Sequence, residues 1–466
     1  MKKNKQHFDD GWKIWIWGNV SRGCSKDGIF RILIDEGFEY SAIKNELNYE
    51  PSQDITLIAN PLTNKTVLES DGEGSSDPPK EKNTLFFPKS EKIKTDLADI
   101  FVVDNFLNKQ ECEKIVELIK QKLAPSTITN KSEEDTTFRT SKTCSLSEIE
   151  NSLIKDVDRR ICQYLGINPS YSEKIQGQHY EIGEEFKAHT DYFEINELEE
   201  FGATQGQRTW SFMIYLNDSQ EGGETLFKNL DVSFNPQKGR AVIWCSLYPN
   251  GCPNPDTIHQ SKPVLEGEKT IITKWFRSQG LGRQFTKTPN ERIAPLTNLG
   301  FCKRSIPNDL LEELIEYYEE NRSDASEESV KDFIKGSGSI TSELIELPQE
   351  LRTKTHDILK PILEKWAGIA LQPTYVYGIR CYRRGARLLP HRDRLETHIV
   401  SATVNIFQDI NEQWALDIED HFYRNHSIFQ RPGEMIMYEG ARLQHGRPKP
   451  YKGNGYASIF VHYKPL

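Results

Sequence analysis

The chain has 466 residues, eight cysteines and a net charge of −10 at pH 7. This length exceeds what a single domain usually holds, so we expect more than one domain. The charge is mildly acidic and no strongly basic cluster stands out, which argues against a nucleic-acid-binding protein, and we expect no nucleic-acid partner.

The first 95 residues predict a small helical head and a linker. Apolar residues at helical spacing predict helices over 26–35 and 40–47, with Ser41 as the N-cap of the second. The head, residues 1–50, carries no chemical motif, and it is either an interaction module or a packing appendage. Residues 51–95 are rich in glycine, serine and proline, which is typical of a linker.

The sequence contains no segment that we expect to enter a membrane. The apolar run from Trp12 to Trp17 is short and is interrupted by Lys13. The cysteines are scattered without a Cys-x-x-Cys pair, so we expect neither a zinc ribbon nor a redox dithiol. These features favour a cytoplasmic protein with reduced thiols and no membrane partner.

Residues 96–280 predict a first domain in which helices precede a series of strands. Residues 100–103 are typical of a strand, and Asn108 is a candidate N-cap for a helix over 109–123. A second helix is expected over 146–165, because Ser145 begins a pattern similar to a capping box. The strands then follow as far as Phe276.

Two histidines and a carboxylate in this domain have the spacing of metal ligands. His189 and Asp191 lie two residues apart, so on a strand both side chains point to the same face. His259 must come from a distant strand. Two histidines and one carboxylate form the ligand set of non-haem Fe(II) sites, which leave coordination positions open. Lys269 begins a β-branched strand run, and a lysine buried there needs an anionic partner such as a dicarboxylate.

Further residues between and around these positions complete a recognisable pattern. It consists of Tyr180, Gly183, His189-Thr-Asp191, Tyr215-Leu-Asn217, Gly222-Gly-Glu-Thr225, Pro236-x-x-Gly239, His259, Pro263-Val264, Gly267-x-Lys269 and Trp275. Over residues 97–279 the pattern resembles the catalytic domain of prolyl 4-hydroxylases. The resemblance implies an Fe(II)- and 2-oxoglutarate-dependent dioxygenase with a double-stranded β-helix, or jelly-roll, fold.

The resemblance also implies roles for individual residues. His189, Asp191 and His259 are implied to bind Fe(2+). The implied contacts to 2-oxoglutarate are Lys269, which pairs with the distal carboxylate, together with Tyr180 and Thr225. The catalytic set is then His189, Asp191, His259 and Lys269, with O2 as the second cosubstrate and L-ascorbate as a supporting reductant.

The implied reaction is hydroxylation of prolyl residues in a peptide or protein, with succinate and CO2 as coproducts. The same chemistry on a lysyl side chain or a small molecule is an alternative. A second alternative is a jelly-roll binding protein whose C-terminal domain is a non-catalytic docking module. The sequence does not indicate an oligomeric state.

After a linker over 281–299, residues 300–466 repeat the pattern of the first domain. Helices are expected over 309–321, capped by Asn308, and over 350–368. The spacing Tyr382, Gly385, His391-Arg-Asp393 then repeats that of Tyr180, Gly183, His189-Thr-Asp191. We therefore expect a mostly β protein with flanking helices (α+β), in which two jelly-roll domains follow the helical head.

The second copy offers His391, Asp393 and His445 as a second metal site, but it departs from the first copy elsewhere. Glu412-Gln-Trp414 replaces Gly-Gly-Glu-Thr, and Tyr456 aligns with Lys269. Three interpretations stay open: a site that uses another base, a site that binds metal without turnover, or a decayed copy. The candidate bases are Arg384, Arg447 and Lys452.

Overall fold

The computed structural model describes residues 5–8, 10–21, 24–51, 55, 58, 86–126, 138–249, 251–328, 330, 332–336 and 341–466. The chain divides into two units. Unit 1 comprises Met1–Leu85 and Ser90–Phe285, and unit 2 comprises Phe86–Lys89 and Thr286–Leu466. Most of the linker expected over 51–95 lies outside the described residues, but its last ten residues are described and include the strand β1 (Glu91–Lys92).

Unit 1 is built around a large antiparallel sheet in the strand order β1-β2-β11-β7-β14-β5-β4-β3. Its strands are β1 (Glu91–Lys92), β2 (Ile100–Val103), β3 (Ala124–Pro125), β4 (Lys142–Ser145), β5 (Gln176–Tyr180), β7 (Arg208–Tyr215), β11 (Ala241–Cys245) and β14 (Lys269–Arg277). Neighbouring strands such as β14 and β5 lie far apart in the sequence, so the sheet closes only when the whole unit folds.

A smaller sheet faces the large one and completes a two-layer β structure. Its order is β10-β9-β12-β6, with β8 and β13 paired beside it. These strands are β6 (Phe186–His189), β8 (Glu221–Gly222), β9 (Thr225–Phe227), β10 (Val232–Phe234), β12 (His259–Ser261) and β13 (Val264–Glu266). Apolar residues of both layers form one core, including Met213 and Ile271 of the large sheet and Phe227 of the small one. The arrangement is that of a jelly roll.

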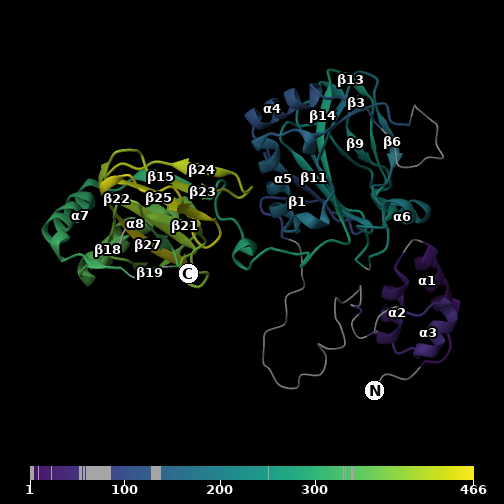
Figure 1. The fold of residues 1–466 in the computed structure, drawn as a ribbon, viewed down its shortest axis with the longest axis horizontal. Coiled ribbons are helices and arrows are strands. Elements are labelled where there is room, and N and C mark those ends of the chain that lie inside the picture. Colours follow the sequence, from purple (N-terminus) through teal and green to yellow (C-terminus); the bar gives the residue numbers. More distant parts are fainter. Residues whose placement is uncertain are drawn as a thin grey trace. The chain divides into compact units, whose positions relative to one another are not determined.

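Helices α4 (Lys109–Lys120) and α5 (Ser152–Leu165) cover the outer face of the large sheet (Figure 1). Gly177 of β5 permits this packing, because a Cβ at that position would lie 2.5 Å from Ile119 of α4. The expected cap of α4 is confirmed: Asn108 and Glu111 form a capping box. The expected helix over 146–165 is wrong in its first turn. Residues Leu146–Glu148 form an isolated 3-10 turn, and α5 starts after Asn151, whose side chain caps it.

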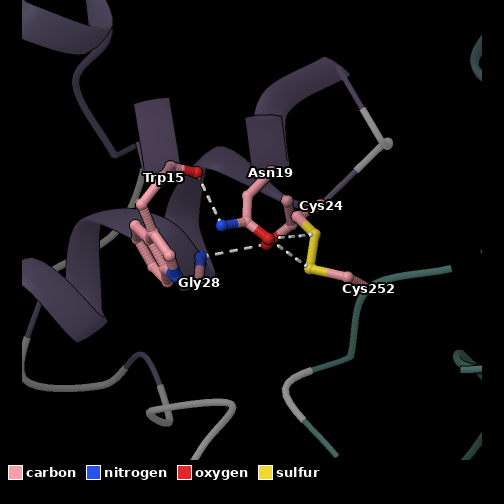
Figure 2. The surroundings of a disulfide bond; sticks show 6 residues. Trp15, Asn19, Cys24, Gly28 and Cys252 are labelled. Atoms are coloured by element: carbon pink, nitrogen blue, oxygen red, sulfur yellow. Dashed lines mark hydrogen bonds between the residues drawn. A yellow bond between two sulfur atoms is a disulfide. The ribbon is translucent and has the colours of Figure 1, made fainter. Parts of the chain in front are cut away.

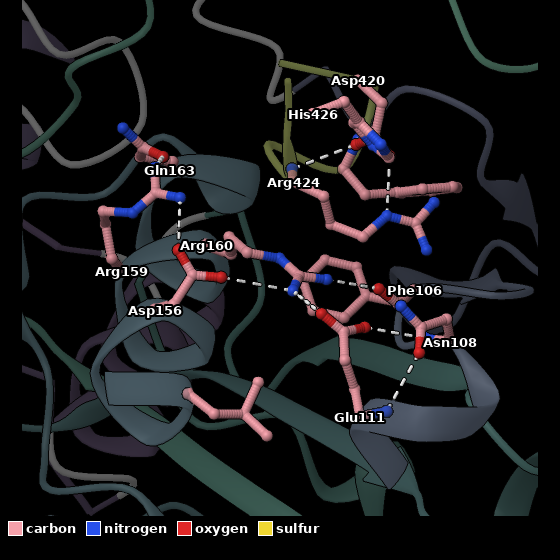
Figure 3. A network of polar contacts seen from close by, with 12 residues as sticks. Phe106, Asn108, Glu111, Asp156, Arg159, Arg160, Gln163, Asp420, Arg424 and His426 are labelled. Carbon is pink, nitrogen blue, oxygen red and sulfur yellow. Dashed lines mark hydrogen bonds and ion pairs between the residues drawn. The ribbon is translucent and has the colours of Figure 1, made fainter. Parts of the chain in front are cut away.

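Arg160 of α5 joins the two helices through buried polar contacts (Figure 3). Its side chain is fully buried, and it donates hydrogen bonds to Glu111 at 2.6 Å and to the carbonyl of Phe106 at 2.7 Å. Asp156 lies 3.4 Å away. Because a buried guanidinium is costly without a counter-charge, Glu111 is the residue on which this arrangement depends.

The N-terminal part of unit 1 holds the helices α1 (Asp10–Ser21), α2 (Lys26–Asp35) and α3 (Tyr40–Leu47). The expected helices over 26–35 and 40–47 are thus present. Ser41 is not the cap of α3, because the helix already begins at Tyr40 and Glu39 occupies the cap position. The Trp12–Trp17 run lies within α1, where Ile16 joins the apolar cluster that holds the three helices together.

A disulfide bond links these helices to the β structure of unit 1. Cys24 pairs with Cys252, and Asn19 of α1 lies beside the bond, with its Oδ1 2.9 Å from the Cys252 sulfur (Figure 2). The expectation that all thiols are reduced is therefore wrong for this pair. Sequence spacing could not indicate it, because 228 residues separate the two cysteines.

Unit 2 also places two sheets against each other. The larger has the order β15-β25-β22-β27-β20-β18-β16, with β19 beside β27, and the smaller has the order β17-β21-β26-β23-β24. The strands are β15 (Phe301–Ser305), β16 (Ser326–Glu327), β17 (Ile334–Lys335), β18 (Ser342–Ile345), β19 (Leu371–Val376), β20 (Ile379–Tyr382), β21 (Arg387–His391), β22 (Val400–Ile410), β23 (Leu416–Glu419), β24 (Asn425–Ile428), β25 (Glu434–Tyr438), β26 (His445–Arg447) and β27 (Gly453–Pro465).

Two helices of unit 2, α7 (Asn308–Asn321) and α8 (Gln349–Ala367), pack on its larger sheet. Leu310 and Leu314 of α7 are buried in a core with Leu359 and Leu363 of α8. Asn308 does not cap α7 as expected, because Pro307 holds the cap position and Asn308 is the first helical residue. Across the residues that the structure describes in both units, no helix is long and apolar enough to span a membrane.

Replacing Glu111 by alanine tests the buried contacts of Arg160. Glu111→Ala removes both the capping box and the main counter-charge of Arg160, so we expect the free energy of unfolding to fall by about 2–4 kcal/mol. The control is Glu113→Ala on the same helix. Glu113 is half exposed and contacts only surface lysines, so its loss should cost less than about 0.5 kcal/mol. Urea unfolding measures both, and equal effects would contradict the assignment.

Removing the disulfide should loosen the N-terminal helices. The bond restricts the unfolded chain, so Cys252→Ser should lower the free energy of unfolding by about 2–5 kcal/mol. Cys302→Ser, which removes a free thiol of unit 2, is the control and should change little. Peptide mapping without reductant should recover the peptide that joins Cys24 to Cys252. Recovery of both cysteines as free thiols from the native protein would refute the pairing.

Candidate metal centre

The residues predicted as metal ligands in unit 1 meet through the pairing of two short strands. Strand β12 runs antiparallel to β6, and His259 stands directly opposite His189. The two imidazole rings lie 4.4 Å apart between centroids, and Asp191 Oδ1 lies 4.0 Å from His259 Nε2. The ligand atoms of all three residues fall within 4.8 Å of one another. A single ion can therefore contact all three.

Backbone carbonyls determine which nitrogen of each histidine faces this point. The Nδ1 atom of His189 lies 2.7 Å from the carbonyl of Lys187, and that of His259 lies 3.0 Å from the carbonyl of Thr257. A carbonyl oxygen only accepts, so each Nδ1 carries the proton and donates it. The lone pair of each Nε2 is consequently free for a metal.

Electrostatics keep the ligands in the protonation states that a metal requires. Burial, helped by the neighbouring His259, lowers the pKa of His189 to about 3, so the ring is neutral at physiological pH. Burial by itself raises the pKa of Asp191, but the adjacent His259 and His189 outweigh it and hold that pKa below its usual range. Ser211 donates a hydrogen bond to Asp191 Oδ2, which orients the carboxylate.

Lys269 brings a buried positive charge to the same cavity. Its side chain is fully buried, and its Nζ donates to Ser261 Oγ at 2.7 Å and lies 5.1 Å from the centre of the Tyr180 ring. Among the described residues no carboxylate forms an ion pair with it. Burial lowers the pKa of Lys269 to about 7. An anionic ligand in the cavity would restore the charge balance.

The cavity is lined by all six residues that the sequence analysis selected in unit 1. They are Tyr180, His189, Asp191, Thr225, His259 and Lys269. The Thr225 hydroxyl accepts a hydrogen bond from Tyr215 at 2.7 Å and donates a long one, of 3.9 Å, to Met213 Sδ. The preceding Gly222 has a φ of +76°, and a Cβ there would lie 2.4 Å from the carbonyl of Pro263. Glycine is therefore required at this turn.

The donor set fits a divalent transition metal. Two neutral imidazole nitrogens and one carboxylate on a single side leave further coordination positions open, which suits non-haem Fe(II). The buried ammonium of Lys269 in the same cavity fits the distal carboxylate of a chelating dicarboxylate. The residues thus fit both groups expected from the sequence.

The sequence analysis missed three residues that support this centre. Ser211 bonds to Asp191, Ser261 bonds to Lys269, and Phe186 stacks on His189 with ring centroids 3.5 Å apart. Ser261 lies two residues after His259 on a strand, so the alternation of side chains could have indicated that it faces the same cavity. The contact of Ser211 depends on which strands pair, and nothing in the local sequence indicates that.

The second predicted ligand set, in unit 2, is brought together in the same way. Strand β26 pairs with β21, and His445 stands opposite His391. Asp393 Oδ1 lies 3.7 Å from His391 Nε2 and 3.6 Å from His445 Nε2, and the ligand atoms again lie within 4.8 Å of one another. Ser401 donates to Asp393 Oδ2 at 2.9 Å, as Ser211 does to Asp191.

The fold and the ligand set of unit 1 define a non-haem iron oxygenase. Consistent with this, the family model of the 2OG-Fe(II) oxygenase superfamily matches residues 175–277. Probable prolyl 4-hydroxylase 3 of Arabidopsis thaliana is 33% identical over 200 residues, covering 38% of this chain and 68% of that protein. Prolyl 4-hydroxylase 13 of the same plant is 30% identical over 199 residues, covering 39% and 71%. The chain therefore belongs to the prolyl 4-hydroxylase family.

Among solved structures, the viral collagen prolyl hydroxylase of Paramecium Bursaria Chlorella virus-1, in its 2OG complex, is similar over 39% of this chain and 96% of that chain. The sequence identity is 23% and the TM-score is 0.32.

The lowered pKa of Lys269 makes the binding of 2-oxoglutarate depend on pH. The carboxylate requires the protonated ammonium, whose population falls about tenfold per unit above pH 7. We expect the affinity for 2-oxoglutarate to fall between pH 7 and pH 9, with proton uptake on binding. Calorimetry of the Mn(II)-loaded protein in buffers of different ionisation enthalpy measures both. Lys269→Arg keeps its charge and should flatten the profile, and a wild-type affinity that rises with pH would contradict this role.

Proposed function

We propose that unit 1 hydroxylates prolyl residues in a peptide or protein, using Fe(II), 2-oxoglutarate and O2 and releasing succinate and CO2. The observation that carries the proposal is the single cavity that joins the metal-ligand set to the buried, unpaired ammonium of Lys269. Membership of the prolyl 4-hydroxylase family supports a prolyl substrate over a lysyl side chain or a small molecule.

In this proposal the metal is held by three residues. His189 and His259 present their Nε2 atoms, and Asp191 supplies a carboxylate oxygen. The carbonyls behind both histidines and the hydroxyl of Ser211 fix the ligands before a metal binds, so little reorganisation is needed. Such an iron, when bound with its cosubstrate, supplies the oxidising power for attack on an unactivated C–H bond.

The rest of the cavity orients the cosubstrate and excludes water. Lys269, supported by Ser261, binds the distal carboxylate of 2-oxoglutarate. The Thr225 hydroxyl would turn from its long 3.9 Å contact with Met213 Sδ to donate to the same ligand, which the hydroxyl of Tyr180, bonded to Gln178 at 2.9 Å, would border. The rings of Phe186 and Trp244 pack against the histidines and keep that side of the metal dry. L-ascorbate would act as the supporting reductant.

The proposal extends to the architecture of the chain. We propose that unit 2 is a diverged second jelly roll and that α1, α2 and α3 form a helical head. The shared register supports the first point, because Lys269 pairs with Tyr180 in one unit and Tyr456 pairs with Tyr382 in the other. The small apolar cluster of the three helices supports the second.

Turnover on a proline-rich peptide tests the proposed reaction. Protein supplied with Fe(II), ascorbate and 2-oxoglutarate should release succinate when the peptide is added and should add one oxygen mass to it. The matched peptide with alanine in place of proline should give only background. His189→Ala should lower the rate by at least about a hundredfold, because it removes a ligand of the metal. Full activity of that variant, or no turnover on any proline-containing peptide, would overturn the proposal.

A further inference from the structure

Unit 2 carries a cavity that the proposed function does not use. Its volume is about 230 Å³, and His391, Asp393 and His445 lie in its wall. Both histidines are fixed as in unit 1: the Nδ1 atom of His391 lies 2.8 Å from the carbonyl of Leu389, and that of His445 lies 2.9 Å from the carbonyl of Leu443. Both Nδ1 atoms therefore donate, and both Nε2 lone pairs converge beside the carboxylate of Asp393.

The ligand set of unit 2 has the same arrangement as that of unit 1, which a purely structural role of these three residues does not explain. His445 is buried and the side chains of His391 and Asp393 are 17% and 10% exposed, so holding these polar groups together costs free energy unless they are paired or bind a ligand. A structural pair would be expected to hydrogen-bond through the Nε2 atoms. Here both Nε2 atoms lie 3.6–3.7 Å from Asp393, which is longer than a hydrogen bond but suitable for a shared ion.

The same cavity contains a buried guanidinium that lacks a counter-charge. Arg447 is 3% exposed, and it donates hydrogen bonds to neutral acceptors, the carbonyl of Trp414 at 2.6 Å and Gln430 Oε1 at 2.7 Å. Within the described part of the chain no carboxylate pairs with it. Arg380, another of the four arginines in the cavity wall, is different, because Glu328 binds it through two hydrogen bonds of 2.6 Å.

Unit 2 has a tyrosine, Tyr456, at the register position of Lys269, and Arg447 supplies a positive charge instead. In unit 1 the charge sits on Lys269 of β14, which reaches Ser261, two residues after His259. In unit 2 the position two residues after His445 is Arg447 itself. Tyr456 occupies the register position of Lys269, and its ring lies 4.8 Å from the Arg447 guanidinium.

In both units a positive charge lies near the metal ligands. Lys269 supplies it from β14 in unit 1, and Arg447 supplies it from β26 in unit 2. The lining of the cavity decides among the three bases that the sequence offered. Arg384 is exposed and bonds to Asn454, and Lys452 is exposed and pairs with Glu412. Only Arg447 lines the cavity.

We propose that unit 2 is a second metal site that binds a small chelating carboxylate, a 2-oxo dicarboxylate by its chemistry, with Arg447 as the anchor for the carboxylate distal to the metal. His391, Asp393 and His445 hold a divalent cation, and the guanidinium supplies two parallel N–H donors for the carboxylate. The proposal stands on unit 2 alone and does not require the proposed reaction of unit 1.

Metal counting on the full chain tests the site. After removal of metal by a chelator, Mn(II) titration monitored by electron paramagnetic resonance should give two ions per wild-type chain. The double variant His189→Ala/His259→Ala should retain one ion, as should His391→Ala/His445→Ala. The combined variant should retain none. A wild-type count of one that disappears with the unit 1 variant would overturn the second site.

The anchor is tested in the His189→Ala/His259→Ala background, where only unit 2 binds metal. Addition of 2-oxoglutarate should tighten Mn(II) binding by about tenfold, because both ligands share one site. Arg447→Met should abolish this gain and leave the affinity for Mn(II) alone within about twofold, which also shows that the variant is folded. Arg447→Lys should restore part of the gain.

The control for the anchor is Lys452→Met, which removes an exposed cation near the same strands and should leave the gain intact. If 2-oxoglutarate fails to tighten Mn(II) binding in this background, or if Arg447→Met retains the gain, the assignment of Arg447 is refuted. Loss of activity in unit 1 plays no part in these readouts. Failure of the prolyl reaction and failure of the second site are therefore separable.

Discussion

The antiparallel pairing of β6 with β12 is the constraint on which the metal centre of unit 1 depends. It sets His259 opposite His189 although the two lie 70 positions apart in the sequence, and it places Asp191 beyond the end of β6. A slip of one residue would turn either histidine to the other face of the sheet. The apolar core between the two sheets resists such a slip, because it would also expose Phe227, which stands opposite His259 on β9.

Both units place two histidines opposite each other on a pair of antiparallel strands, but the polar residues around these pairs differ. His391 and His445 pair as His189 and His259 do, and a serine on the central strand holds the aspartate in each case. The cation that we propose for unit 2, Arg447, differs from Lys269 in residue type and lies on a different strand. The positions of the paired histidines depend on the pairing of their strands, and they are alike in both units. A cation has only to place its charge in the cavity, so it can come from more than one strand.

The sequence predicted the centre well where the chemistry is local or the spacing is periodic. His189 and Asp191 meet as predicted, although Asp191 lies beyond the end of β6 and not on the strand whose alternation predicted it. The capping box at Asn108 follows from residue types three positions apart. Some of the failures are local, whereas the missed disulfide between Cys24 and Cys252 is not. The helix expected from residue 146 ignored that Asn151 is an equally good cap, so α5 starts later. Contacts across the fold, such as those of Ser211, require the strand order and could not be predicted from one sequence.

The disulfide between Cys24 and Cys252 has a practical consequence for any shortened form of this protein. The region that matches the oxygenase family begins at residue 175, yet β5 and β11 find their neighbours β4 and β2 upstream of it. A fragment cut there exposes unpaired strand edges, which promote aggregation. A longer fragment that begins at residue 96 keeps those neighbours but loses Cys24. Cys252 then becomes an uncovered thiol that can cross-link two chains, so a covalent dimer of such a fragment would be a product of the truncation and not a native assembly.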